Sequence, residues 1–114
     1  MNSQEFVDAI KIAVLDSAVH SVESNLIDPP GRKPAEDLKK MSIWYNSLDD
    51  DAKKMVLQIV KYGSYISVFG FLCVLDGVRA IESGEQGELK LYYEKDGLAI
   101  LLNNPSEDEL HNLL

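Results

Sequence analysis

The sequence predicts an α+β fold that is mostly α-helical, with a three-helix core, a long central buried helix, a C-terminal β-hairpin and a short terminal helix. Three observations predict it: apolar residues recur at helical spacing before residue 27, residues 61–82 form a long apolar segment, and Asp96-Gly97 separates two short apolar runs. Asp-Gly between apolar runs is a strong hairpin signal. With 114 residues, the chain is expected to form a single domain, residues 1–114.

The first helix is expected over about residues 3–26. Ser3 is a suitable helix start, and the apolar residues that follow keep a helical period. Small residues at a spacing of four form one stripe along this helix, namely Ala9, Ala13, Ser17 and Ser21. Three prolines and a glycine between residues 29 and 34 then stop the helix.

Two further helices are expected over about residues 34–48 and 50–82. Pro34 suits a first helical position. The aspartates at 49–51 suit the start of the third helix, because carboxylates are favoured at the positive end of the helix dipole. Ser83-Gly84 marks the expected end of that helix.

The segment from Lys61 to Glu82 is expected to be the buried centre of the molecule. Its apolar run from Tyr65 to Leu75 has about eleven positions, fewer than the roughly twenty that a bilayer needs. A helix that is apolar all round must be covered on several faces. Gly63, Gly70 and Gly77 recur at a spacing of seven, and we expect this glycine stripe to pack against the small-residue stripe of the first helix.

The hairpin is expected over about residues 88–103, followed by a short helix over about 106–113. The two-residue turn places Tyr93 opposite Ile100 and Tyr92 opposite Leu101. Because an isolated hairpin is marginal in water, one of its faces is a candidate interface. That face carries Tyr92, Ala99 and Leu101. In the terminal helix, Glu107 and His111 are spaced as a surface pair.

Composition excludes several classes of function. A net charge of -8 argues against nucleic-acid binding, because there is no basic excess to neutralise phosphates. The single cysteine, Cys73, lies in the apolar run and is expected to be buried and inert. The first residues lack the features of a signal peptide, so a cytoplasmic location is expected, without membrane association. No motif for a phosphate, a dinucleotide cofactor or a metal is present.

Two groups of polar residues are candidates for chemistry. Asp16, His20 and Glu23 share one helix face, where the alternatives are a ligand face and a solvated face, and we favour the solvated one. Asp76 and Arg79 lie one turn apart at the end of the apolar run. They form either a structural pair locking the helix end or part of a ligand site. The ligand-binding candidates are Asp76, Arg79 and His20.

The motif PPGRKP followed by YISVFGFLCVLDGVRAIE resembles a small bacterial family to which no function is assigned. The resemblance implies a bacterial origin and a helical domain with a hairpin, and it carries no chemistry over. In size and acidity the chain is also similar to bacterial immunity proteins, which neutralise a basic toxin.

The sequence therefore favours a non-enzymatic, acidic interaction protein. It would be either a homodimer or an immunity-like binder of another protein, because the net charge is -8 and no catalytic constellation is present. The alternative is a small-ligand-binding protein or an enzyme, with a pocket near Asp76 and Arg79. No cofactor is expected in either case.

Overall fold

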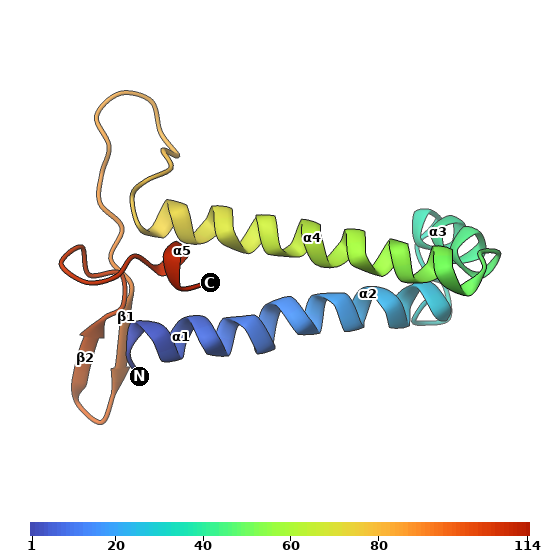
Figure 1. Ribbon diagram of the computed structural model, residues 1–114, viewed down its shortest axis with the longest axis horizontal. Coiled ribbons are helices and arrows are strands. Elements are labelled where there is room, and N and C mark those ends of the chain that lie inside the picture. Colours follow the sequence, from blue (N-terminus) through green and yellow to red (C-terminus); the bar gives the residue numbers. More distant parts are fainter. The chain divides into compact units, whose positions relative to one another are not determined.

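The computed structural model describes residues 1–114 and is mostly helical, with one antiparallel hairpin near the C-terminus and a short terminal helix (Figure 1). The predicted class, α+β and mostly α, is confirmed. In chain order the elements are α1 (Ser3–Ile10), the π-helical segment η1 (Lys11–Asp16), α2 (Ser17–Ile27), α3 (Glu36–Asn46), α4 (Asp50–Leu75), β1 (Tyr92–Lys95), β2 (Leu98–Leu101) and α5 (Leu110–Leu113).

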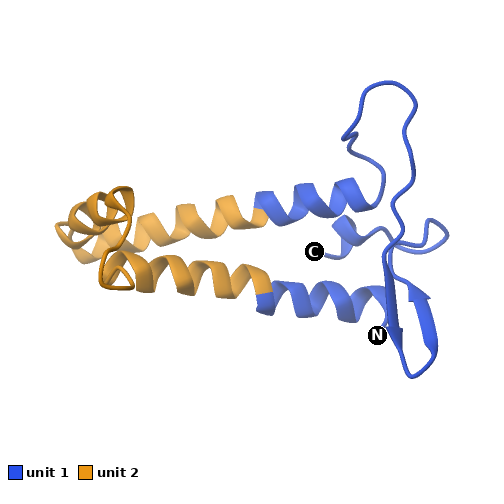
Figure 2. Ribbon diagram, turned by 180° about the vertical axis from the view of Figure 1, so that it is seen from behind, with its two compact units in different colours: residues 1–13, 66–114 blue, residues 14–65 orange.

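The chain divides into two compact units (Figure 2). Unit 1 combines residues 1–13 with residues 66–114, so it holds α1, the end of α4, the hairpin and α5. Unit 2 is the continuous stretch 14–65 and holds α2, α3 and the first part of α4. Unit 1 is thus assembled from two stretches that are far apart in the sequence.

The core of unit 1 joins three helices through one fully buried side chain from each. Val7 of α1, Leu72 of α4 and Leu110 of α5 form this cluster. An isolated helix of four residues is not stable in water, so α5 depends on this contact. Partly buried side chains complete the core, namely Phe6, Val68, Leu75, Leu113 and Leu114.

The start of α1 is fixed by two polar contacts. Asn2 caps the helix, since its Oδ1 accepts the N–H of Glu5 at 2.8 Å. Ser3 is buried, and its hydroxyl donates to the Leu102 carbonyl at 2.7 Å. Ser3 thus ties α1 to the residue that follows β2.

The hairpin has the predicted register. Tyr93 pairs with Ile100 and Tyr92 with Leu101. Asp96 and Gly97 both have positive φ, 53° and 78°, as a two-residue turn of the favoured hairpin type requires.

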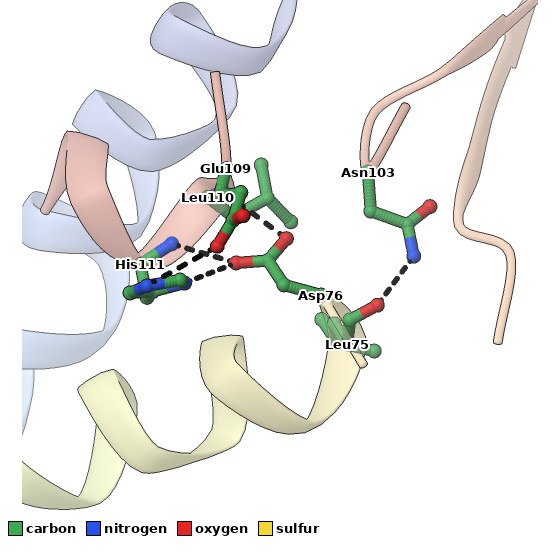
Figure 3. Close-up of polar contacts among 6 residues, drawn as sticks. All are labelled: Leu75, Asp76, Asn103, Glu109, Leu110 and His111. Atoms are coloured by element: carbon green, nitrogen blue, oxygen red, sulfur yellow. Dashed lines mark hydrogen bonds and ion pairs between the residues drawn. The ribbon is translucent and has the colours of Figure 1, made fainter. Parts of the chain in front are cut away.

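Asn103 joins the base of the hairpin to the end of α4 (Figure 3). Its side-chain amide donates to the carbonyls of Leu75, at 2.6 Å, and Leu89, at 2.8 Å. Its Oδ1 accepts the N–H of Leu91 at 2.8 Å. One side chain therefore satisfies a helix-end carbonyl that has no partner within α4.

In unit 2, α3 covers the end of α2. The hydroxyl of Ser42 donates to the Leu26 carbonyl at 2.7 Å, and the Asn46 amide donates to the same carbonyl at 3.2 Å. These bonds satisfy a carbonyl in the last turn of α2. Tyr45 is buried, and the Lys53 ammonium lies over its ring, 5.6 Å from the ring centroid. This is a cation–π contact.

Helix α4 begins where predicted and ends earlier than predicted. Asp49 caps it by accepting the N–H of Ala52 at 2.8 Å. It ends at Leu75 rather than near residue 82, because Gly77 adopts φ +77° and the N–H of Val78 bonds back to the Cys73 carbonyl at 3.0 Å. This left-handed glycine closure is a common helix terminator, and it acts before Ser83-Gly84 is reached.

Helix α4 is much less buried than the sequence predicts. Its buried residues are Gly70, Leu72 and Cys73, so the expected buried thiol is confirmed. By length and composition alone the helix could cross a membrane, contrary to the expectation that it is too short. The predicted buried centre is instead a long apolar helix with a large exposed surface.

The predicted packing of the glycine stripe against the first helix is wrong. A Cβ added at Gly63 would meet no atom within 4 Å, and one added at Gly70 would meet the Arg79 guanidinium. Gly77 lies outside the helix. The three glycines therefore have different roles. Gly63 is exposed, Gly70 contacts the Arg79 side chain, and Gly77 terminates the helix.

Candidate functional site

Asp76, directly after α4, is the centre of the most connected polar cluster in unit 1 (Figure 3). Its side chain is 3% exposed. Oδ1 accepts the N–H of Leu110 at 3.1 Å, and Oδ2 accepts the N–H of His111 at 2.9 Å. These are the first N–H groups of α5, so Asp76 caps that helix from the end of α4. The terminal helix begins at Leu110, later than its expected start near residue 106.

The imidazole of His111 lies between two carboxylates. Nδ1 is 2.7 Å from Oδ2 of Asp76, and Nε2 is 3.3 Å from Oε2 of Glu109. The ring also meets Phe69 in an edge-to-face contact, with centroids 5.5 Å apart. One ligand-type atom from each of the three polar residues lies within 4.8 Å of the others. A carboxylate behind an imidazole is an arrangement that orients histidine for metal binding or proton transfer.

The predicted pair of His111 with Glu107 is wrong. Asp76 and Glu109 are the partners of the ring instead. Asp76 is 35 residues away in the sequence, so no local spacing signals this contact.

Arg79 and Asp76 do not form the expected structural pair. The Asp76 carboxylate is occupied by α5, whereas the Arg79 guanidinium lies over Gly70. Arg79 lines an open hollow of about 440 Å³, and Glu82 and Glu88 line the same hollow. Asp76 is not among its lining residues. The two candidates therefore do not converge on one pocket.

His20, the third ligand candidate, lies on α2 in unit 2, whereas Asp76 and Arg79 are in unit 1. His20 and Asp16 are exposed, and Glu23 is half-buried. This exposure agrees with the favoured interpretation of a solvated helix face.

The candidate interface on the hairpin is partly accessible. Tyr92 and Ala99 are exposed, and Leu101 is half-buried. Ala99 pairs with Glu94, so a carboxylate shares this face with the apolar residues. The face is therefore less apolar than its three named residues suggest.

A larger apolar surface, which was not among the predicted interfaces, runs along α4. Met55, Ile59, Tyr62 and Ile66 follow one another at spacings of four, three and four, and they are between 47% and 68% exposed. We call these four residues the outer stripe. The signal was present in their spacing. Two of the four residues, Tyr62 and Ile66, fall within residues 61–82, where the sequence predicts burial.

Comparison of the chain with family models, with curated proteins and with solved structures finds no match.

Proposed function

We propose that this protein acts by binding protein rather than by catalysis, and that its partner is a second copy of the chain that covers the outer stripe of α4. The observation that carries this proposal is the exposure of four large apolar side chains in a row on one helix. Contiguous exposed apolar patches are uncommon on monomers and typically mark interaction sites.

The spacing of the outer stripe suits contact with another helix. Spacings of four and three place residues on the seam used by paired helices, in which each side chain inserts between those of the partner. In a two-fold dimer the same stripe faces itself, so one apolar surface supplies both sides of the contact. No second complementary surface is required.

Charge favours a second copy over a basic partner. The residues that flank the stripe between its ends are uncharged, namely Val56, Gln58, Gly63 and Tyr65. Two copies can approach here without like charges facing each other, although the net charge of each is -8. A surface that captures a basic toxin would be expected to present acidic groups around the contact, so the immunity-like alternative is less well supported.

The length of the outer stripe, as distinct from that of α4 as a whole, favours a helix partner over a bilayer. From Met55 to Ile66 the stripe extends about 17 Å at 1.5 Å per residue, whereas the hydrocarbon core of a bilayer is about 30 Å thick. Lys61 interrupts the apolar surface of the helix. Beyond the stripe, Leu72 packs in the core of unit 1.

Light scattering coupled to size exclusion over a range of concentrations tests the proposal. We expect a dimer for the native chain, and a dissociation constant at least about tenfold higher for Ile59→Glu, because each copy would bury a charge in the contact. The matched control is Ile43→Glu, which places the same substitution at an exposed position on α3 and should leave the dimer intact.

Two results from light scattering would contradict the proposal, and so would one result from vesicle flotation. One is a native chain that stays monomeric at its highest soluble concentration. The other is a dimer that Ile59→Glu leaves intact while Leu98→Glu, on the exposed hairpin strand, dissociates it, which would move the interface to the hairpin. Flotation of the native chain with neutral phospholipid vesicles, abolished by Ile59→Glu, would assign the stripe to a bilayer instead.

A further inference from the structure

We infer that His111 and Glu109 bind a divalent metal ion of the zinc type, with Asp76 holding the imidazole in the ligating orientation. This site lies at the start of α5, in unit 1, and does not depend on the dimer proposed above. It rests on the close approach of three ligand-type atoms, on the distance between Nε2 of His111 and Oε2 of Glu109, and on how the ring is held.

The surroundings of Asp76 assign the proton on Nδ1 of His111. The carboxylate accepts the backbone N–H groups of Leu110 and His111, so it acts as the charged cap of α5. An ionised carboxylate has no proton to donate. Nδ1, at 2.7 Å from Oδ2, is therefore assigned as the donor in that contact, because Asp76 already accepts two backbone N–H groups.

With the proton on Nδ1, two acceptor atoms lie close together, namely Nε2 of His111 and Oε2 of Glu109. A neutral imidazole with its proton on Nδ1 has a bare lone pair at Nε2. That atom lies 3.3 Å from Oε2 of Glu109, which is also an acceptor. Two acceptors at this distance are stable only with a positive centre that both can bind, either a proton on Nε2 or a metal ion.

The distance fits two ligands of one tetrahedral ion. Zinc bonds of about 2.0–2.1 Å place neighbouring ligand atoms about 3.3–3.4 Å apart in a tetrahedron, and the observed separation of Nε2 and Oε2 is 3.3 Å. A nitrogen and a carboxylate oxygen form a suitable donor pair for Zn²⁺. Ca²⁺ and Mg²⁺ prefer oxygen ligands alone.

The ring is held as a ligating histidine usually is. Its remote N–H meets a buried carboxylate, and Phe69 packs edge-to-face against it. Such outer-sphere carboxylates fix the orientation of metal-bound imidazoles and raise their basicity. The His111 side chain is 13% exposed and that of Glu109 is more open, so water can complete the coordination from the solvent side.

Titration of the native chain with ZnCl₂ by calorimetry tests the site, with MgCl₂ as the comparison ion. We expect one Zn²⁺ per chain and no comparable heat with Mg²⁺. His111→Gln should abolish binding, and Glu109→Gln should weaken it by at least about tenfold. The matched controls are His20→Gln, which removes the other histidine, and Asp108→Asn, which neutralises an exposed carboxylate beside Glu109. Both controls should bind as the native chain does.

Circular dichroism of each variant shows whether it is folded, and Glu109→Gln leaves the Asp76 contacts in place if His111→Gln does not fold. The ¹⁵N resonance of Nε2 in His111 supplies a second measurement, since it should shift when Zn²⁺ is added. The inference is overturned if the native chain binds no Zn²⁺, if binding is lost in His20→Gln but kept in His111→Gln, or if the resonance reports only a protonated ring that Zn²⁺ leaves unchanged.

Discussion

The C-terminal end of α4 and the outer stripe differ in burial. At the C-terminal end of α4, within unit 1, Leu72 is buried against α1 and α5. Asp76, directly after the helix, accepts the backbone N–H groups of Leu110 and His111. Along the outer stripe the same helix presents large apolar side chains to solvent. Both regions are apolar in sequence. The difference shows that composition does not decide burial in this chain, and that the deciding factor is whether a distant segment is brought back to cover the helix.

The largest effect is expected from the core at the covered end. Leu110→Ala should lower the free energy of unfolding by about 2–5 kcal/mol, because it leaves a cavity at a fully buried position. Leu98→Ala, at a leucine that is 71% exposed, should change it by less than about 0.5 kcal/mol. Urea denaturation followed by circular dichroism measures both. Equal effects would mean that α5 is not part of the stable core.

The second largest effect is expected from Asp76, the charged cap of α5. Asp76→Asn should lower the free energy of unfolding by about 1.5–3 kcal/mol, the range for hydrogen bonds to a charged group, because the N–H groups of Leu110 and His111 lose a full negative charge. Their amide hydrogen exchange should quicken selectively. Asp108→Asn is the control, since this carboxylate is exposed. Unchanged exchange at α5 in Asp76→Asn would refute the capping role.

Replacing two glycines by alanine, Gly63 within α4 and Gly77 after its end, should change the free energy of unfolding in opposite directions. Gly77→Ala should lower the free energy of unfolding by about 1–2 kcal/mol, because φ is +77° there. Gly63→Ala should raise it by about 0.5–1 kcal/mol, since alanine favours the helix and a Cβ would meet no atom within 4 Å. Thermal and urea denaturation at a concentration that keeps the chain monomeric separate the two. A destabilising Gly63→Ala would indicate that the exposed side of α4 is already covered.

The smallest effect is expected in unit 2. Lys53→Gln should lower the free energy of unfolding by about 0.5–1 kcal/mol, because the ammonium no longer lies over the Tyr45 ring. Lys54→Gln, at an exposed neighbouring position, is the matched control and should have almost no effect. If the two variants are indistinguishable by urea denaturation, the cation–π contact contributes nothing measurable.

The features that could be predicted from the sequence are those with local causes. Asp96-Gly97 predicts the turn and, through it, the register of the hairpin, because a two-residue loop leaves one pairing. The aspartate at position 49 predicts the start of α4 through its cap. Both signals involve residues only a few positions apart, and both predictions are confirmed.

The candidate site could not be predicted in this way. Asp76 meets His111 across 35 residues, and the nearer Glu107 had a better helical spacing than the partners the ring has in the structure. Gly77 illustrates a second limit, since a glycine in an apolar run can be a packing position or a helix terminator. Only its positive φ distinguishes the two.

The bond from Ser3 to the Leu102 carbonyl spans 99 residues, and it bears on the order in which the chain can fold as it is synthesised. Residues 14–65 emerge as one continuous block, so the contacts of unit 2 can form while the ribosome is still adding the remainder. The first thirteen residues must wait for partners made about a hundred residues later, because Ser3 bonds to Leu102 and Val7 packs against Leu110. Until then the apolar face of α1 is open to chaperones and to other nascent chains.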